Sequence, residues 1–163
     1  MLTVVLPGYS PSNKAWVLET KRQLEVSGEV YAHGWRHWDG SSVFDSDFEI
    51  AKIIDVVGDT DLNFVAKSVG TDVLMKLLPK IVKHVSKIVL CGIPIDPIKH
   101  TGSFKLVDPE KILVIQNTGD PFMPSKLIKS YIGLINRKIR VLEKKADNHD
   151  YPYYEDFRSF LFI

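Results

Sequence analysis

Six short runs of apolar and β-branched residues recur along the chain, and most are near-continuously apolar rather than alternating. They span residues 2–6, 29–33, 62–66, 87–92, 111–117 and 138–144. A near-continuous apolar run is typical of a parallel strand that helices cover on both faces. The pattern therefore predicts six strands in a mostly parallel sheet.

Helical patterns separate most of these runs. Apolar positions at helical spacing predict helices over residues 12–27, 46–57 and 69–78, Pro124 is placed to begin another, and the aromatic tail 151–163 is expected to form the last. Strands that alternate with helices predict an α/β fold, with a doubly wound six-stranded sheet and helices on both faces. A length of 163 residues favours a single domain over residues 1–163.

Three details of the helices follow from local signals. Ser46 and Glu49 have the spacing of a capping box at the start of the second helix. Pro79 is expected to end or kink the third helix, because proline lacks the backbone N–H that a helix interior needs. Residues 93–110 carry three prolines and show no clear helical pattern, so we expect an irregular link there.

Composition narrows the classes of partner. The formal net charge of +1 provides no electrostatic footprint for nucleic acid, and no segment approaches the roughly 18 apolar residues of a membrane helix. The N-terminus lacks the pattern of a signal peptide. Cys91, the one cysteine, lies in an apolar run and is expected to be a buried hydrophobe. We therefore expect a cytoplasmic protein with no nucleic-acid or membrane partner; the oligomeric state is unknown from the sequence.

Chemistry-bearing residues follow four of the predicted strands. These stretches are "PGYS" (7–10), "AKSVG" (66–70), "NTGDPFMP" (117–124) and "ADNHDY" (146–151). In a doubly wound sheet, sites form beyond the carboxyl ends of the strands. The sequence therefore predicts that Ser68, Asp120 and His149, in that chain order, meet at one edge of the sheet.

This arrangement resembles the α/β-hydrolase superfamily, which has a serine on a G-x-S-x-G turn followed along the chain by an acid and a histidine. The resemblance covers nearly the whole chain and implies a minimal α/β-hydrolase fold. It implies that Ser68 is the nucleophile, His149 the base and Asp120 the acid, with the backbone amides of Tyr9 and Val69 as the oxyanion hole. The size of the chain resembles the small lidless branch that includes the retinoblastoma-binding-protein-like serine hydrolases.

The activity that this resemblance implies is hydrolysis of a carboxylic ester, thioester or amide through an acyl-enzyme, without metal or organic cofactor. The short 93–110 segment leaves little material for a lid, so we expect an open site and a small-molecule or peptide acyl substrate. Ser10, Lys67 and Trp35 are the residues that we expect to bind it, because each follows or ends a predicted strand.

The chain departs from the family pattern at the elbow. Ala66 replaces the first glycine, yet the crowded turn needs small side chains more than glycine itself. Lys67 stands where the family usually has histidine or another polar residue; its ammonium would favour an oxyanion or an acidic substrate, or point to solvent. In the first turn Pro7 replaces the histidine that often precedes Gly8, at little direct cost, because the oxyanion hole uses backbone amides.

The same residues also allow other interpretations. A serine before an apolar helix is ordinarily an N-cap. His33, His37 and Asp39 suggest a metal site, a loop that packs its tryptophans on the sheet, or one wall of the substrate pocket. A non-catalytic α/β-hydrolase fold that acts as a binding module would explain Ala66 and Lys67 as a decayed elbow. A nucleotide-binding or flavodoxin-like domain fits the alternation, but the chain lacks G-x-G-x-x-G and a P-loop.

Overall fold

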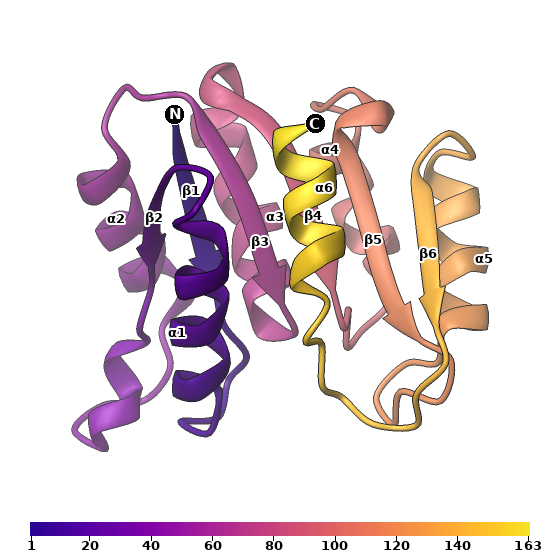
Figure 1. Cartoon of the computed structure of the whole chain (residues 1–163), viewed down its shortest axis with the longest axis horizontal. Helices are drawn as coiled ribbons and strands as arrows, with labels where there is room; N and C mark the ends of the chain where they lie inside the picture. Colours follow the sequence, from indigo (N-terminus) through magenta and orange to yellow (C-terminus); the bar gives the residue numbers. More distant parts are fainter.

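A six-stranded sheet runs through the computed structural model, which describes residues 1–163 (Figure 1). Its strands are β1 (Leu2–Leu6), β2 (Glu29–Ala32), β3 (Leu62–Lys67), β4 (Val85–Cys91), β5 (Ile112–Asn117) and β6 (Arg140–Lys144). The order across the sheet is β2-β1-β3-β4-β5-β6, and every neighbouring pair is parallel. The predicted fold class is confirmed.

Helices cover both faces of the sheet. The long ones are α1 (Asn13–Leu24), α2 (Ser46–Val57), α3 (Val69–Ile81), α5 (Ser125–Ile135) and α6 (Tyr154–Phe162). Helices α1 and α6 lie on the near face in Figure 1, and α2, α3 and α5 lie on the far face. Each face buries its own apolar cluster, of 12 and 27 residues respectively. Burial on both sides explains why the inner strands are apolar without alternation.

The expected capping box at the start of α2 is wrong. Asp45, not Ser46, is the N-cap, and its Oδ1 accepts hydrogen bonds from the amides of Asp47 and Phe48. Glu49 does not return to the cap. Its carboxylate is buried and accepts hydrogen bonds from His33 and from the amide of Arg36 instead, so a tertiary contact replaces the local one.

Helix α3 continues past Pro79 to Ile81, beyond the end that the proline predicted. A proline at position 79 leaves the carbonyl of Met75 without its helical donor. The hydroxyl of Ser103 donates to that carbonyl at 2.6 Å and replaces the missing bond. A side chain from a distant segment therefore makes the proline tolerable.

Ser103 belongs to the 93–110 segment, which contains short helical turns rather than only irregular chain. These are the 3-10 turns η3 (Pro97–His100) and η4 (Pro109–Lys111) and the short helix α4 (Thr101–Phe104). Two prolines begin turns here, each after an aspartate whose carboxylate caps the turn. Two further 3-10 turns are η1 (Arg36–Asp39) and η2 (Val82–His84).

The carboxyl ends of all six strands meet at one edge of the sheet, at the bottom of Figure 1, and both termini lie toward the opposite edge. The stretches 7–10, 66–70, 117–124 and 146–151 all lie at or just beyond this edge. None of the helices combines the length and apolarity that crossing a bilayer requires.

Candidate active site

The turn from β3 to α3 holds Ser68 in a strained conformation. With φ of 54° and ψ of −123°, Ser68 is the one non-glycine residue of positive φ in the chain. Such a conformation costs about 1–3 kcal/mol and persists where the surrounding structure enforces it. The Ser68 side chain makes no capping hydrogen bond to α3. An ordinary N-cap residue has a negative φ, and its side chain bonds the helix. Ser68 does neither, so this turn is a strained elbow that presents a free hydroxyl.

Close packing around the elbow explains the small residues at positions 66 and 70. A Cβ added at Gly70 would lie 2.6 Å from the carbonyl oxygen of Leu6 and 2.8 Å from that of Pro7. These are backbone atoms at the end of β1, which cannot move aside. Ala66 is completely buried, and the structure accommodates its methyl group. Glycine is therefore required at position 70, whereas position 66 needs only a small side chain.

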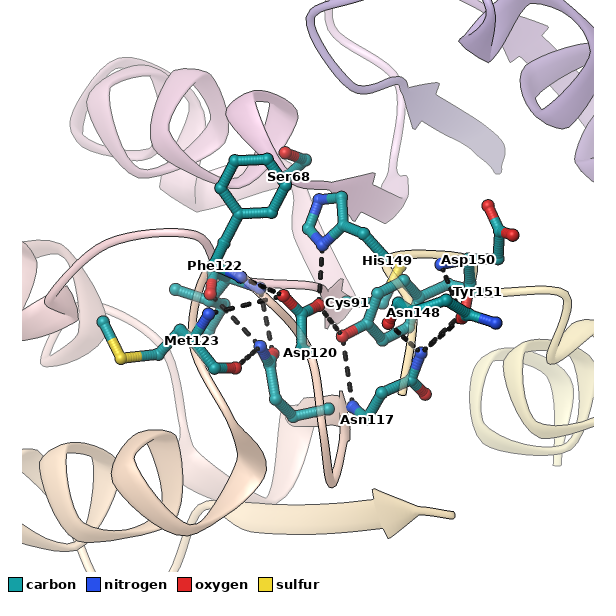
Figure 2. A network of polar contacts seen from close by, with 12 residues as sticks. Ser68, Cys91, Asn117, Asp120, Phe122, Met123, Asn148, His149, Asp150 and Tyr151 are labelled. Carbon is teal, nitrogen blue, oxygen red and sulfur yellow. Dashed lines mark hydrogen bonds and ion pairs between the residues drawn. The ribbon is translucent and has the colours of Figure 1, made fainter. Parts of the chain in front are cut away.

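Asp120 and His149 come together at the same edge. His149 Nδ1 donates to Asp120 Oδ2 at 2.6 Å, and the Asp120 residue is only 2% exposed. The other carboxylate oxygen, Oδ1, accepts from the amides of Phe122 and Met123 at 2.9 and 3.3 Å. Figure 2 shows Asp120 at the centre of this network. Backbone donors therefore fix the carboxylate in the position from which it orients the imidazole.

The second imidazole nitrogen of His149 is free. His149 Nε2 is buried and has no hydrogen-bond partner, and no hydrogen bond joins it to the Ser68 hydroxyl. The Phe122 ring lies beside the imidazole, with ring centroids 4.6 Å apart. Ser68 and His149 line one pocket of about 620 Å³. His149 Nε2 is therefore able to accept a proton, because no other protein group forms a hydrogen bond with it.

Tyr151 is a member of this network that the sequence reasoning missed. Its hydroxyl donates to Asp120 Oδ2 at 2.6 Å and accepts from the amide of Asn117 at 3.1 Å. Burial raises the pKa of this phenol, and its hydrogen bond to Asp120 raises it further. The phenol therefore stays protonated and remains a donor. A hydroxyl-bearing aromatic two residues after His149 was the available signal.

Asn117, also missed, fastens the loop that carries His149 to the end of β5. Its side-chain amide donates to the carbonyls of Asn148 and Asp150 at 3.0 and 2.9 Å, and its Oδ1 accepts from the Tyr153 hydroxyl. One buried side chain thus holds residues on both sides of the histidine. Asn117 therefore holds the His149 loop in place together with Asp120.

Gly92, just after β4, provides the space in which this loop packs. A Cβ there would lie 2.6 Å from Tyr151 Cε2 and 3.0 Å from His149 Cε1, and the residue has a φ of +61°. We expect Gly92→Ala to displace both rings and lower kcat about 100-fold. Overpacking is expected to lower the free energy of unfolding by about 1–3 kcal/mol. Ester hydrolysis and urea denaturation measure the two effects.

Gly133→Ala is the matched control for Gly92→Ala. Gly133 lies in α5, its φ is not positive, and no atom lies within 4 Å of an added Cβ. This variant should keep full activity, and its free energy of unfolding should rise by about 0.5–1 kcal/mol, because alanine is the better helix former. Equal activity of the two variants would contradict the role assigned to the space at Gly92.

The structure does not place Trp35 in the pocket. Its side chain is buried at 3% exposure, and its indole N–H donates to the carbonyl of Gly8 at 2.8 Å. His37 Nε2 and Trp38 Nε1 both donate to the carbonyl of Tyr9. The 33–40 segment therefore supports the first turn through hydrogen bonds to the carbonyls of Gly8 and Tyr9. Trp35 does not line the pocket that contains Ser68. This support orients the Tyr9 amide, which makes no hydrogen bond within the chain.

We expect Trp35→Phe to lower the free energy of unfolding by about 1–3 kcal/mol, because it leaves the buried carbonyl of Gly8 without its donor. Trp38→Phe is the control: the carbonyl of Tyr9 keeps its bond from His37, so the loss should stay below about 1 kcal/mol. Urea denaturation of both variants measures the difference. A larger loss in Trp38→Phe would contradict this account of the support.

His33 and His37 diverge rather than share a ligand. His33 Nε2 contacts the Glu49 carboxylate at 2.7 Å and its Nδ1 contacts the Tyr31 hydroxyl at 2.9 Å, whereas His37 bonds the first turn. Burial lowers the pKa of His33. His33 therefore bonds Tyr31 and Glu49, whereas His37 bonds the first turn, and the two imidazoles do not face a common ligand.

Lys67 and Ser10 line the same pocket as Ser68. The Lys67 ammonium donates to Asn13 Oδ1 at 2.9 Å and lies 5.4 Å from the centre of the Trp16 ring. Asn13, which the sequence reasoning missed, packs on Gly8: a Cβ at position 8 would lie 2.7 Å from Asn13 Oδ1. Gly8 therefore provides the space that the Asn13 side chain fills, and its φ is not positive.

The structure resembles solved α/β hydrolases. A lidless α/β serine hydrolase from Xanthomonas campestris aligns with a TM-score of 0.71 at 16% identity, over 97% of this chain and 77% of that one. An α-β serine hydrolase homologue from Coxiella burnetii aligns with a TM-score of 0.75 at 15% identity, over 99% and 83%. The ydeN gene product of B. subtilis aligns with a TM-score of 0.66 at 15% identity, over 98% and 97%.

No protein-family model matches the chain, and no curated protein matches its sequence. At such low identities the likeness concerns the fold alone. The chain therefore has the fold of the α/β serine hydrolases, and the chemistry rests on its own residues.

Proposed function

We propose that this chain is a serine hydrolase of a single domain, which cleaves a carboxylic ester, thioester or amide through an acyl-enzyme. One observation carries the proposal: the strained Ser68 shares a pocket with His149, whose Nδ1 donates to the buried Asp120. A nucleophile, a base and a group that orients the base are the three parts that such catalysis requires.

The hydrogen bond to Asp120 selects the tautomer of the histidine. With Nδ1 as the donor, neutral His149 keeps Nε2 as an acceptor. Nε2 takes the proton from the Ser68 hydroxyl as the Ser68 oxygen attacks the acyl carbon. It then gives this proton to the leaving group as the bond between the acyl carbon and the leaving group breaks. Water then attacks the acyl-serine with Nε2 again as the base. Asp120 stabilises the imidazolium in both steps.

The developing oxyanion is assigned to two backbone amides. Val69 begins α3, so its amide has no preceding helical turn to bond to, and the helix N-terminus favours negative charge. The Tyr9 amide makes no hydrogen bond within the chain. Removing one such donor from a comparable site costs on the order of 10²–10³ in kcat, which indicates how much depends on the first turn.

The small lidless branch, including the retinoblastoma-binding-protein-like hydrolases, remains the proposed relative. The Xanthomonas structure is described as lacking a lid, and the short helices of 93–110 leave little chain for one here. The proposed substrate is correspondingly a small-molecule or peptide acyl compound. The proposed chemistry uses no metal and no organic cofactor.

Hydrolysis of 4-nitrophenyl butyrate tests the proposal. We expect repeated turnover, and intact-mass spectrometry of acid-quenched samples should show one butyryl group per chain. Folded protein that neither turns over this ester nor acquires an acyl group would overturn the enzyme proposal. It would favour the alternative, a non-catalytic binding module, for which the missing hydrogen bond between Ser68 and His149 is the motivating observation.

A further inference from the structure

Lys67 is a buried cation without a carboxylate partner. The residue is only 5% exposed, yet its ammonium forms none of the ten ion pairs of the chain. An ammonium has three N–H donors, and the protein supplies one acceptor, Asn13 Oδ1 at 2.9 Å. Burying a charge with so little compensation is costly, so this position calls for a further acceptor.

Neighbouring groups do not supply that acceptor. The indole face of Trp16, 5.4 Å away, contributes a weak cation–π contact. Asp150 lines the same pocket but is exposed and lies beyond ion-pair distance of Lys67. Burial lowers the pKa of Lys67, and the more distant carboxylates of Asp150 and Asp120 partly oppose that shift. An anion that entered the pocket would therefore gain a strong, poorly hydrated partner.

The pocket places this cation beside the reacting hydroxyl. Lys67 and Ser68 are consecutive, so their Cα atoms are about 3.8 Å apart, and both line the pocket of about 620 Å³. A molecule with an ester and a carboxylate a few bonds apart can therefore contact both residues at once. A neutral ester of the same length would leave the ammonium with Asn13 Oδ1 alone and without the further acceptor that a carboxylate provides.

We propose that Lys67 binds a carboxylate of the substrate, so that the hydrolase acts on esters that carry a free acid. This inference rests on the proposed function, because it assigns a substrate class to the same pocket. The acid belongs either to the acyl group or to the leaving group, and matched substrates distinguish the two. Charge-assisted hydrogen bonds to a buried ammonium provide the discrimination.

Two pairs of esters test this assignment. Mono-(4-nitrophenyl) adipate against 4-nitrophenyl hexanoate tests an acid on the acyl side, and 4-acetoxybenzoate against its methyl ester tests an acid on the leaving group. We expect kcat/KM to favour the acid in one pair by at least about 10-fold. Lys67→Met should reduce that acid-to-neutral ratio about 10- to 100-fold, whatever its effect on the neutral ester.

Lys14→Met is the matched control, since Lys14 is an exposed lysine in α1 that does not line the pocket. It should leave the acid-to-neutral ratio as in the wild type. A ratio near one in the wild type for both pairs would overturn the inference. A Lys67→Met variant that slows acid and neutral esters equally would also overturn it and would make Lys67 a support for Asn13.

Binding of adipate dianion, measured by calorimetry, separates this inference from the proposed function. We expect wild type and Lys14→Met to bind adipate and Lys67→Met to bind it about 10- to 100-fold more weakly. Lys67-dependent binding of adipate by a protein that hydrolyses no ester would uphold the carboxylate site and overturn the proposed hydrolase function. Ser68-dependent hydrolysis with neither acid preference nor Lys67-dependent adipate binding would uphold the hydrolase and overturn the inference.

Discussion

Replacing Ser68 by alanine is expected to abolish ester hydrolysis, with a loss in kcat on the order of 10⁶-fold. In the proposed mechanism this hydroxyl forms the acyl bond, and no other hydroxyl in the pocket lies on a strained elbow. Alanine adopts the positive φ at the same cost as serine, and the Ser68 hydroxyl caps nothing in α3. The fold should therefore survive, which circular dichroism and urea denaturation check alongside the assay.

Ser12→Ala is the matched control for Ser68→Ala. Ser12 is exposed, lines the same pocket, and its hydroxyl bonds only to Ser10 Oγ. Its removal should change kcat less than about 3-fold, in keeping with the small effects of substitutions at exposed sites. If Ser68→Ala retained wild-type activity, another nucleophile would have to be sought.

Asp120→Asn is expected to lower kcat by about 10⁴-fold without unfolding the chain. The asparagine carbonyl can still accept from the amides of Phe122 and Met123, which places its NH₂ group toward His149. His149 Nδ1 then becomes the acceptor, and Nε2 carries the proton that it should receive. The proposed base is thereby held in the wrong tautomer. Nitrogen chemical shifts of His149, measured by NMR, report the change directly.

Asp147→Asn controls for the loss of a charge near the histidine. Asp147 lies on the loop of His149, is exposed, and makes no hydrogen bond with the imidazole. It should retain activity within about 3-fold, as exposed positions usually do. A loss in Asp147→Asn as large as that in Asp120→Asn would overturn the assignment of Asp120 as the acid.

The sheet was predictable because its signals are local. Near-continuous apolar runs indicated strands covered on both faces, and the structure has all six of them in a parallel sheet. The rule that parallel strands present their carboxyl ends at one edge then predicted where residues 68, 120 and 149 would lie. In the structure all three lie at that edge: Ser68 and His149 share a pocket, and Asp120 binds His149.

The remaining features depend on contacts between distant segments. The bond from Ser103 to the carbonyl of Met75 allows α3 to pass Pro79, and Glu49 leaves its expected cap for His33. Trp35 follows a strand, as pocket residues do, but its indole finds a backbone acceptor 27 residues away and turns inward. No local pattern encodes such pairings, so sequence reasoning named the residues but missed their partners.

Supports of the candidate site were hidden for the same reason. Tyr151 and Asn117 act through hydrogen bonds that span more than 30 residues, and Gly92 matters only because two rings pack against it. The sequence singles out Lys67 by its position beside Ser68, but its burial and its bond to Asn13 appear only in three dimensions.

Covalent labelling by a fluorophosphonate probe tests the central claim most directly, because the probe reacts with a serine only when a base activates it. Digestion of the labelled wild-type protein and mass spectrometry of the peptides locate the modified residue. The proposed mechanism predicts one phosphonyl group per chain, on Ser68, with labelling lost in Ser68→Ala and strongly slowed in Asp120→Asn. Folded wild-type protein that stays unlabelled, or that carries the label on another residue, would contradict it.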